Sequence, residues 1–179
     1  MLRAIGAVFS ISWQQALELI RPYHAITVNL SLNYGRMFRE HGFIRQPTPK
    51  RGAHLLTAAE FCKELDERLH HGERIFASVS PNHATAILPC ICEDGKTRYK
   101  VVDSWDCSGN TVKNYWIHPG PGQALPEGML NLEGESFACR PYGKGKIEYV
   151  CGYADNPEVL VVFPDGTRRI FYYSRKESA

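Results

Sequence analysis

The spacing of apolar residues changes near Gly72, and this change constrains the fold more than any other feature of the sequence. Before Gly72, apolar residues recur every three or four positions, as they do in helices that are buried on one face. After Gly72, β-branched and aromatic residues alternate with polar ones in short runs bounded by turn residues, as in strands. Helices followed by an antiparallel sheet are the α+β pattern, so we expect an α+β fold.

The first 72 residues predict helices joined by short loops. Ser12 with Gln15, and Thr57 with Glu60, each have the spacing of a capping box, in which two side chains satisfy free backbone amides at a helix start. We expect helices over residues 2–9, 12–22, 31–40 (capped by Ser31) and 57–70. Trp13, Ala16, Leu17 and Ile20 are the predicted buried stripe of the second helix. Residues 24–30 fit neither period, and residues 46–53 are expected to form a loop.

The rest of the chain predicts strands in two groups. The first group covers residues 74–80, 84–92, 97–104 and 112–117. A Pro- and Gly-rich segment follows, and then a second group covers residues 128–140, 146–153, 159–163 and 168–173. We therefore divide the chain into a main domain (1–117), a linker (118–127) and a small β-strand appendage (128–179).

Charge and hydropathy exclude several classes of protein. The net charge of +2 comes with scattered Lys and Arg residues, which predicts no nucleic-acid partner. No apolar run approaches the roughly 18 residues that a transmembrane helix needs, so we expect no membrane partner. The N-terminus lacks the pattern of a secretory signal, which favours a cytoplasmic location. Six irregularly spaced cysteines in a chain of this length indicate reduced thiols.

A hairpin in the first group of strands brings two chemically useful residues together. Asp94-Gly95 lies between two apolar, β-rich runs, which is a strong signal for a β-hairpin. His83 would open the first strand and Asp103 would end the second, so the two should lie side by side. A histidine whose ring is oriented by a carboxylate supplies two parts of a catalytic triad.

Four stretches of the first 117 residues carry a family resemblance. They are Arg3-Ala4-Ile5 with Ser12-Trp13, then Glu40-His41-Gly42-Phe43, then Thr57-Ala58-Ala59-Glu60-Phe61, and finally His83 with Asp103 to Ser108 and Tyr115-Trp116. In their order and spacing they resemble a group of small papain-like cysteine-peptidase-related proteins of phages and bacteria. The resemblance implies a papain-like fold, in which N-terminal helices pack on an antiparallel sheet. If the protein is phage-encoded, its location would be the host cytoplasm.

The resemblance also implies the roles of the site residues. His83 would be the general base and Asp103 the residue that orients it. In that group the nucleophilic cysteine lies three residues before the arginine that Arg3 matches, which here falls just before Met1. Either the true start lies upstream and includes the cysteine, or the protein is a relative that kept the fold without the peptidase activity. In both cases Met1 is expected to lie near His83.

The remaining candidates are weaker. Asp106 competes with Asp103 for the orienting role, and Cys107 is a conceivable replacement nucleophile, although it lies in a turn and not at a helix start. Cys62 is predicted to be a core residue. Cys90 and Cys92 have one residue between them, where zinc sites usually have two to four, so they too are predicted to be core residues. We expect no metal and no cofactor.

Two functions fit these observations. The first is a papain-like cysteine hydrolase acting on a peptide, isopeptide or amide bond. The second is a catalytically inactive domain of the same fold that binds a peptide or protein. In either case Trp13, Trp105 and Trp116 are the predicted substrate-binding residues around His83.

Overall fold

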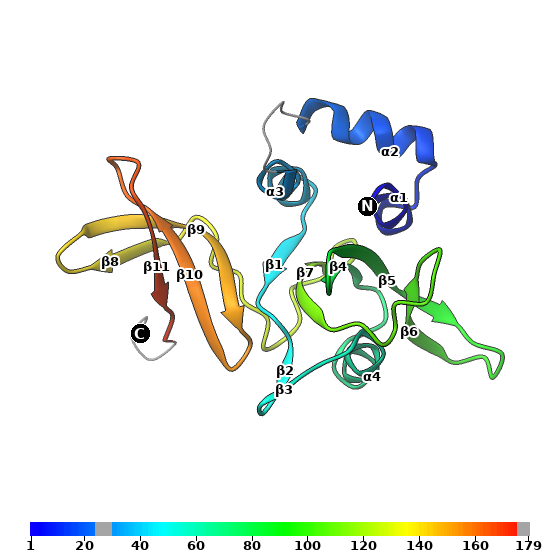
Figure 1. Ribbon diagram of the computed structural model, residues 1–179. Helices are drawn as coiled ribbons and strands as arrows, with labels where there is room; N and C mark the ends of the chain where they lie inside the picture. Colours follow the sequence, from blue (N-terminus) through cyan, green and yellow to red (C-terminus); the bar gives the residue numbers. More distant parts are fainter. Residues whose placement is uncertain (24–29, 175–179) are drawn as a thin grey trace.

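The computed structural model describes residues 1–23 and 30–174, and in these residues the chain is α+β, as the sequence predicts. A five-stranded antiparallel sheet forms the centre, with α4 on one face and the N-terminal helices on the other (Figure 1). A four-stranded sheet built from the C-terminal part of the chain lies beside it (Figure 1). The helices are α1 (Leu2–Phe9), α2 (Trp13–Ile20), α3 (Leu30–Glu40) and α4 (Ala58–Arg68), with a 3-10 turn η1 (Arg21–Tyr23). No helix in the described ranges is both long and apolar enough to cross a membrane.

Both predicted capping boxes are confirmed. The Ser12 hydroxyl accepts from the Gln15 amide at 3.2 Å, and the Gln15 side chain accepts from the Ser12 amide at 2.9 Å. Thr57 and Glu60 make the same reciprocal pair at the start of α4. The prediction that Ser31 caps the third helix is wrong, because Ser31 lies inside α3. The ambiguous residues 24–29 lie outside the described part of the chain.

The buried stripe predicted for α2 is only partly right. Ala16 and Ile20 are buried, but the Trp13 side chain is 61% exposed. Trp13 is the first residue of α2, one turn before Ala16, and the helix makes its buried contacts with its later residues. This residue therefore lies on the surface and not in the stripe.

The central sheet has the strand order β1-β7-β4-β5-β6. Its strands are β1 (Ile44–Gln46), β4 (Arg74–Val79), β5 (His83–Ile91), β6 (Thr97–Val102) and β7 (Val112–His118). The last four agree with the predicted strands to within two residues. Gly95, with φ of +76°, closes the turn between β5 and β6, where a left-handed backbone favours glycine. The two strands then pair with Ala86 opposite Val102.

The predicted loop over residues 46–53 contains strand structure. Gln46 ends β1, which pairs with β7 as an edge strand of the central sheet. The chain then forms the short pair β2 (Lys50–Arg51) and β3 (His54–Leu55). Strand β1 depends on pairing with the distant strand β7, and β2 and β3 pair with each other over only two residues. The local pattern of prolines and glycine reveals neither pairing.

Each face of the central sheet has its own apolar core. On one face, Phe61 and Leu65 of α4 pack with Ile75, Ile87 and Ile117. On the other face, residues of the first three helices pack against the sheet residues Phe76, Ala86 and Trp116. Phe38 of α3 lies at the centre of this second core, with ring centroids 4.6 Å from Phe76 and 5.5 Å from Trp116. The helices are therefore held on the sheet, and α1 lies next to β5.

The C-terminal strands form an antiparallel sheet in the order β11-β10-β9-β8, as the sequence predicts for the appendage. The predicted strand over residues 128–140 is too long, because residues 128–135 form turns and irregular structure before β8 begins. The strands are β8 (Ser136–Cys139), β9 (Gly143–Tyr153), β10 (Asn156–Val162) and β11 (Arg168–Tyr172). They enclose a separate apolar cluster that includes Leu130, Ile147, Val150, Val159 and Val161.

The last residue of β1 and the segment after it connect the two sheets. The side-chain amide of Gln46 donates to the Leu130 carbonyl at 2.7 Å and accepts from the Leu130 amide at 3.0 Å. Thr48 pairs through its backbone with both Gly152 and Ala154. The C-terminal sheet therefore packs on the edge strand of the main domain through directed hydrogen bonds.

Candidate functional site

His83 and Asp103 lie together where β5 begins and β6 ends in the central sheet. His83 is the first residue of β5, and Asp103 directly follows β6, the strand that pairs with it. The imidazole Nε2 lies 2.6 Å from Asp103 Oδ2. The expectation that these two side chains reach hydrogen-bonding distance is confirmed.

The carboxylate of Asp103 is held from several sides. Its Oδ1 accepts from the Ser104 amide at 2.6 Å, while its Oδ2 faces His83 and, at 3.8 Å, the thiol of Cys107. Burial raises the pKa of Asp103, but the interactions with His83, Thr85 and Ser104 outweigh burial and lower that pKa to about 2. The buried Thr85 hydroxyl lies close to the Asp103 carboxylate, although it makes no hydrogen bond of ordinary geometry in the described chain. Asp103 is therefore ionised at neutral pH.

The ionised carboxylate determines which nitrogen of His83 can act as a base. A carboxylate only accepts hydrogen bonds, so Nε2 carries the proton that bridges to Asp103. In the neutral ring, Nδ1 is then left with its lone pair free to accept a proton. This is the arrangement of a general base whose tautomer is fixed by a carboxylate.

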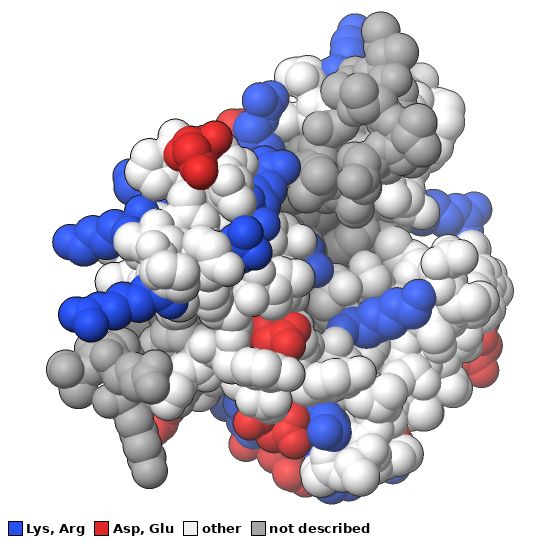
Figure 2. Space-filling model, turned by 60° about the vertical axis from the view of Figure 1, so that its left-hand side comes forward, with Lys and Arg blue, Asp and Glu red and all other residues white. Residues whose placement is uncertain are grey.

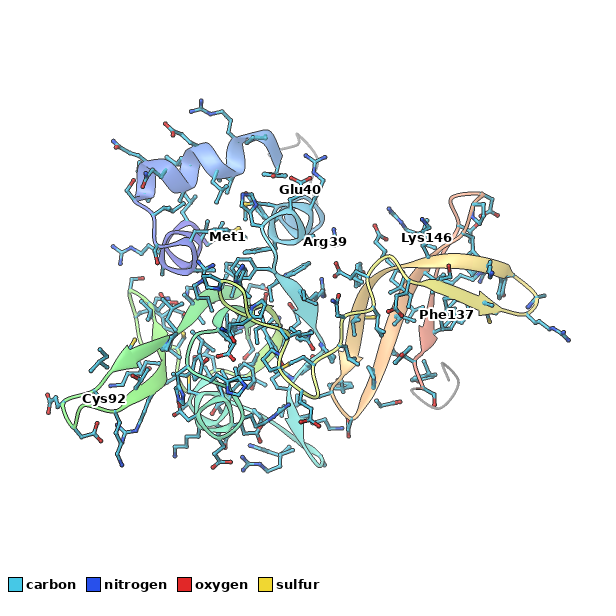
Figure 3. The ribbon with its side chains drawn as sticks, turned by 180° about the vertical axis from the view of Figure 1, so that it is seen from behind. Met1, Arg39, Glu40, Cys92, Phe137 and Lys146 are labelled. Carbon is cyan, nitrogen blue, oxygen red and sulfur yellow. The ribbon has the colours of Figure 1, made fainter. Side chains whose placement is uncertain are left out.

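A pocket of about 340 Å³ connects His83 with the start of the first helix. Met1, Asn82, His83, Lys113 and Asn114 are among its lining residues. Met1 is the N-cap of α1, and it makes no side-chain hydrogen bond to the free amides of the first turn. In Figure 3, Met1 lies between α1 and α3. The expectation that Met1 lies near His83 is thus met.

The three tryptophans occupy different surroundings. Trp105 contacts His83, with ring centroids 4.6 Å apart, and its side chain is 47% exposed. Trp116 is 7% exposed and packs in the core, where it also lines a second cavity that contains Met1. Trp13 lines none of the described pockets around His83. Only Trp105 is a direct neighbour of the imidazole.

The alternative site residues have other roles in the structure. Asp106 accepts from the backbone and hydroxyl of Ser108, so it stabilises a turn and does not compete for His83. Cys107 is fully buried, and burial raises the pKa of its thiol. A protonated thiol behind the carboxylate can support Asp103, but it is poorly placed to attack a substrate. Cys62 is a core residue, as predicted, whereas Cys90 and Cys92 are only half-buried.

Among the residues that the structure describes, His83, Asp103 and Cys107 form a group that could hold a metal ion. Their ligand atoms lie within 4.8 Å of one another, and the nitrogen, oxygen and sulfur set suits zinc. However, the bond between Nε2 and Oδ2 already satisfies both groups, and the raised pKa of Cys107 opposes the thiolate that a metal requires. The arrangement fits a hydrogen-bonded group better than a metal centre.

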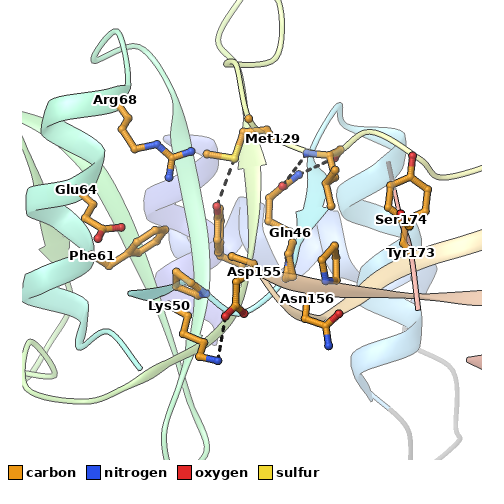
Figure 4. Close-up of a pocket in the computed structure, with 17 residues that line it drawn as sticks. Gln46, Lys50, Phe61, Glu64, Arg68, Met129, Asp155, Asn156, Tyr173 and Ser174 are labelled. Atoms are coloured by element: carbon orange, nitrogen blue, oxygen red, sulfur yellow. Dashed lines mark hydrogen bonds and ion pairs between the residues drawn. The ribbon is translucent and has the colours of Figure 1, made fainter. Parts of the chain in front are cut away.

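Two larger cavities do not include His83 among their described lining residues. One, of about 620 Å³, lies between α4 and β6 and includes Asp103 and Trp105. The other, of about 590 Å³, lies between α4 and the C-terminal sheet, and Figure 4 shows Lys50 paired with Asp155 at its border. The cavity of about 590 Å³ shares no described lining residue with the His83 pocket, so it belongs to the junction between the sheets.

Searches among protein-family models, curated proteins and solved structures found no match to this chain. The papain-like resemblance therefore stays a prediction from the residues quoted above.

Sequence reasoning missed the residues that surround the pair. Thr85 and Cys107 support Asp103 from inside the fold, and Ser78 and Asn114 complete the pocket that Met1 and His83 share. Asn114 carried one signal, since it is a polar residue inside the predicted strand over residues 112–117. That signal does not single out Asn114, because a half-buried strand ordinarily carries polar residues on one face.

Proposed function

We propose that the protein is a papain-like cysteine hydrolase that cleaves a peptide, isopeptide or amide bond. His83 is the base, and Asp103 orients it. The observation that carries this proposal is the shared pocket in which the ring held by Asp103 meets the N-cap of α1. A nucleophile placed directly before Met1 would stand at a helix start and beside the base.

The chemistry follows from that placement. A thiol just before Met1 would be favoured as thiolate by the positive end of α1 and by transfer of its proton to Nδ1 of His83. The thiolate attacks the carbonyl carbon, and the free backbone amides at the start of α1 can donate to the resulting oxyanion. His83 then returns the proton to the leaving amine, and water hydrolyses the thioester.

The second candidate function is a peptide- or protein-binding domain of the same fold. The observation that favours it concerns the thiols of the chain itself. None of the six cysteines lines the pocket that Met1 and His83 share, and Cys107, the nearest to Asp103, is fully buried. In this case the pocket holds a partner and His83 acts as a hydrogen-bonding residue.

The test is to supply the thiol and measure its reactivity. Ala-Asp-Cys is added before Met1, and the rate of iodoacetamide labelling of that cysteine is followed against pH by peptide mass spectrometry. We expect half-maximal reactivity well below the usual thiol pKa of about 8.5. His83→Ala in the extended chain should slow labelling at neutral pH by about tenfold, since most of the thiol is then protonated.

The control is the same chain with the extra cysteine placed after Ala179 instead of before Met1. If the N-terminal and C-terminal cysteines titrate alike, or if His83→Ala has no effect, the hydrolase proposal is wrong and the binding function is favoured. If the extended chain labels rapidly, a library of peptides and isopeptides then identifies the bond that it cleaves.

A further inference from the structure

A second cavity, of about 280 Å³, continues the pocket of His83 toward the C-terminal sheet. The two share Met1, Ser78, Ala84 and Asn114 as lining residues, so a ligand could extend from one into the other. Arg39, Arg45, Trp116 and Tyr149 are among the residues that line the far part. Tyr149 belongs to β9, which means that the C-terminal sheet completes this cavity.

The cavity has more positive than negative charge around it. Arg39 pairs with Glu133 at 2.9 Å, and Arg168 pairs with Glu148 at 3.2 Å. Arg45 makes no ion pair with any described residue. Arg39 and Arg45 are among the described residues that line the cavity, and no acidic residue is, although Glu133, the partner of Arg39, also acts electrostatically on Arg45.

Arg45 lies against two aromatic rings, and its only described carboxylate influence is a longer-range one from Glu133, with no ion pair. Its guanidinium lies 4.5 Å from the ring centroid of Tyr149 and 6.0 Å from that of Trp116. Its Nε is buried without a hydrogen-bond partner in the described chain. A buried Nε–H without a partner is costly, and a carboxylate that accepts from it and from a second N–H of the guanidinium would offset that cost.

Figure 2 shows the surface hollowed between the C-terminal sheet and the rest of the molecule, with Lys and Arg side chains on the border of the hollow. In Figure 3, Arg39 lies on the part of α3 that faces the C-terminal sheet. An anionic ligand in the cavity would therefore meet Arg45, whose Nε has no hydrogen-bond partner in the described chain, and Arg39.

We infer that this cavity is a carboxylate-binding subsite of the His83 site, so that the preferred ligand is a peptide carrying an acidic side chain or a free C-terminus near the bond at His83. The inference rests on the proposed function for the position of that bond, but binding itself needs only the cavity. Arg45 supplies the charge, while Trp116 and Tyr149 form the apolar walls beside it.

The experiment is calorimetric binding of three acetylated tetrapeptides to the chain as it stands. They are Ala-Ala-Glu-Ala and Ala-Ala-Gln-Ala with amidated ends, and Ala-Ala-Gln-Ala with a free C-terminus. We expect one carboxylate-bearing peptide to bind at least about tenfold more tightly than the neutral one, equivalent to about 1.4 kcal/mol. The peptide that shows the preference identifies the source of the carboxylate. Equal binding of all three, or binding of none, overturns the inference.

Matched variants locate the subsite. Arg45→Gln should abolish the preference, whereas Arg36→Gln, the same change at a largely exposed position on α3, should leave it intact. If Arg45→Gln fails to fold, Arg45→Lys is used instead. It keeps the positive charge but removes the planar guanidinium, and so tests whether two parallel N–H groups are needed to bind the carboxylate. An equal loss in Arg36→Gln would mean that general charge, and not this cavity, binds the peptide.

The outcome is separable from the proposed function. The carboxylate preference is measured without any added thiol, and His83→Ala should retain it because His83 does not line the second cavity. A preference without a reactive thiol in the extended chain would leave the subsite standing and favour the binding domain. A reactive thiol without the preference would leave the hydrolase standing and remove the subsite.

Discussion

His83 and Asp103 are 20 residues apart in the sequence, yet Nε2 of one lies 2.6 Å from Oδ2 of the other. The hairpin between β5 and β6 produces this contact, since its turn at Gly95 sets the register that brings the start of one strand beside the end of the next. The side chain of Asp103 is only 6% exposed, so the contact is shielded from water. This pair is the part of the molecule from which a chemical role can be argued most directly.

The first prediction concerns the pH dependence of stability that Asp103 causes. Its pKa of about 2 in the folded chain is below the usual 3.8, so its ionised form stabilises the fold above about pH 4, and this contribution is lost as the pH falls toward 2. Asp103→Asn should lower the free energy of unfolding at pH 6 by about 1–3 kcal/mol. The gap to the unaltered chain should narrow as urea unfolding is repeated from pH 5 down to pH 2.5.

Glu67→Gln is the control for that experiment, because it removes the same charge from an exposed position on α4. It should change the free energy of unfolding by less than about 0.5 kcal/mol at every pH. A constant gap between the unaltered chain and Asp103→Asn across this range would show that the carboxylate is not stabilised by its neighbours.

The second prediction concerns the six thiols of the folded chain. Burial raises the pKa of Cys62 to about 12 and also raises that of Cys107. Both should resist iodoacetamide at pH 8, while the half-buried Cys90, Cys92 and Cys139 react first. Labelling is followed by peptide mass spectrometry, with a urea-unfolded sample to show that all six can react. Rapid labelling of Cys107 in the folded chain would make it the reactive thiol of the site.

Features that depend on neighbouring residues were the ones that could be predicted from the sequence. A capping box needs only four residues, and both boxes occur where the sequence places them. The pairing of His83 with Asp103 needs only one hairpin with a recognisable turn. The strands of the C-terminal sheet were likewise marked by turn residues such as Asp165-Gly166.

Features that depend on distant segments could not be predicted in this way. The edge strand β1 exists because Ile44 pairs with Ile117, far along the chain. Arg45 reaches Tyr149 only because the C-terminal sheet folds back onto that edge. The exposure of Trp13 has a similar origin, since helical spacing indicates an apolar stripe but not where along the helix its packing begins.

The third prediction tests the close packing of β9 against β10. A Cβ atom on Gly145 would lie 2.5 Å from Val161 Cγ1 and 2.8 Å from the Val162 carbonyl oxygen. Gly145→Ala should therefore destabilise the fold by about 1–3 kcal/mol, because the backbone oxygen cannot move aside as a flexible side chain can. The measurement is urea unfolding, with hydrogen exchange to show that the loss of protection is centred on β9 and β10.

Gly109→Ala is the matched control for Gly145→Ala. A Cβ atom at Gly109 meets no atom within 4 Å, and its backbone does not require glycine. It should leave stability unchanged or raise it slightly, since alanine reduces the freedom of the unfolded chain. If both alanine variants unfold like the unaltered chain, β9 and β10 are less closely packed than the structure indicates.

The last prediction concerns Gln46, which connects the main domain to the C-terminal sheet. It is 2% exposed, and its amide pairs with both the N–H and the carbonyl of Leu130. Gln46→Leu keeps the approximate volume but leaves both Leu130 groups unpaired in a buried position. The free energy of unfolding should fall by about 2–4 kcal/mol, and the Leu130 amide should exchange its hydrogen faster.

Gln14→Leu on the exposed surface of α2 is the control for Gln46→Leu, since it makes the same chemical change without burial. It should unfold like the unaltered chain. Because Gln46 helps to hold the sheet that supplies Tyr149 to the cavity at Arg45, Gln46→Leu should also weaken the preference for a carboxylate-bearing peptide. Equal stability of the two leucine variants would mean that the sheets are held together mainly by other contacts, such as the backbone pairing of Thr48 with Gly152 and Ala154.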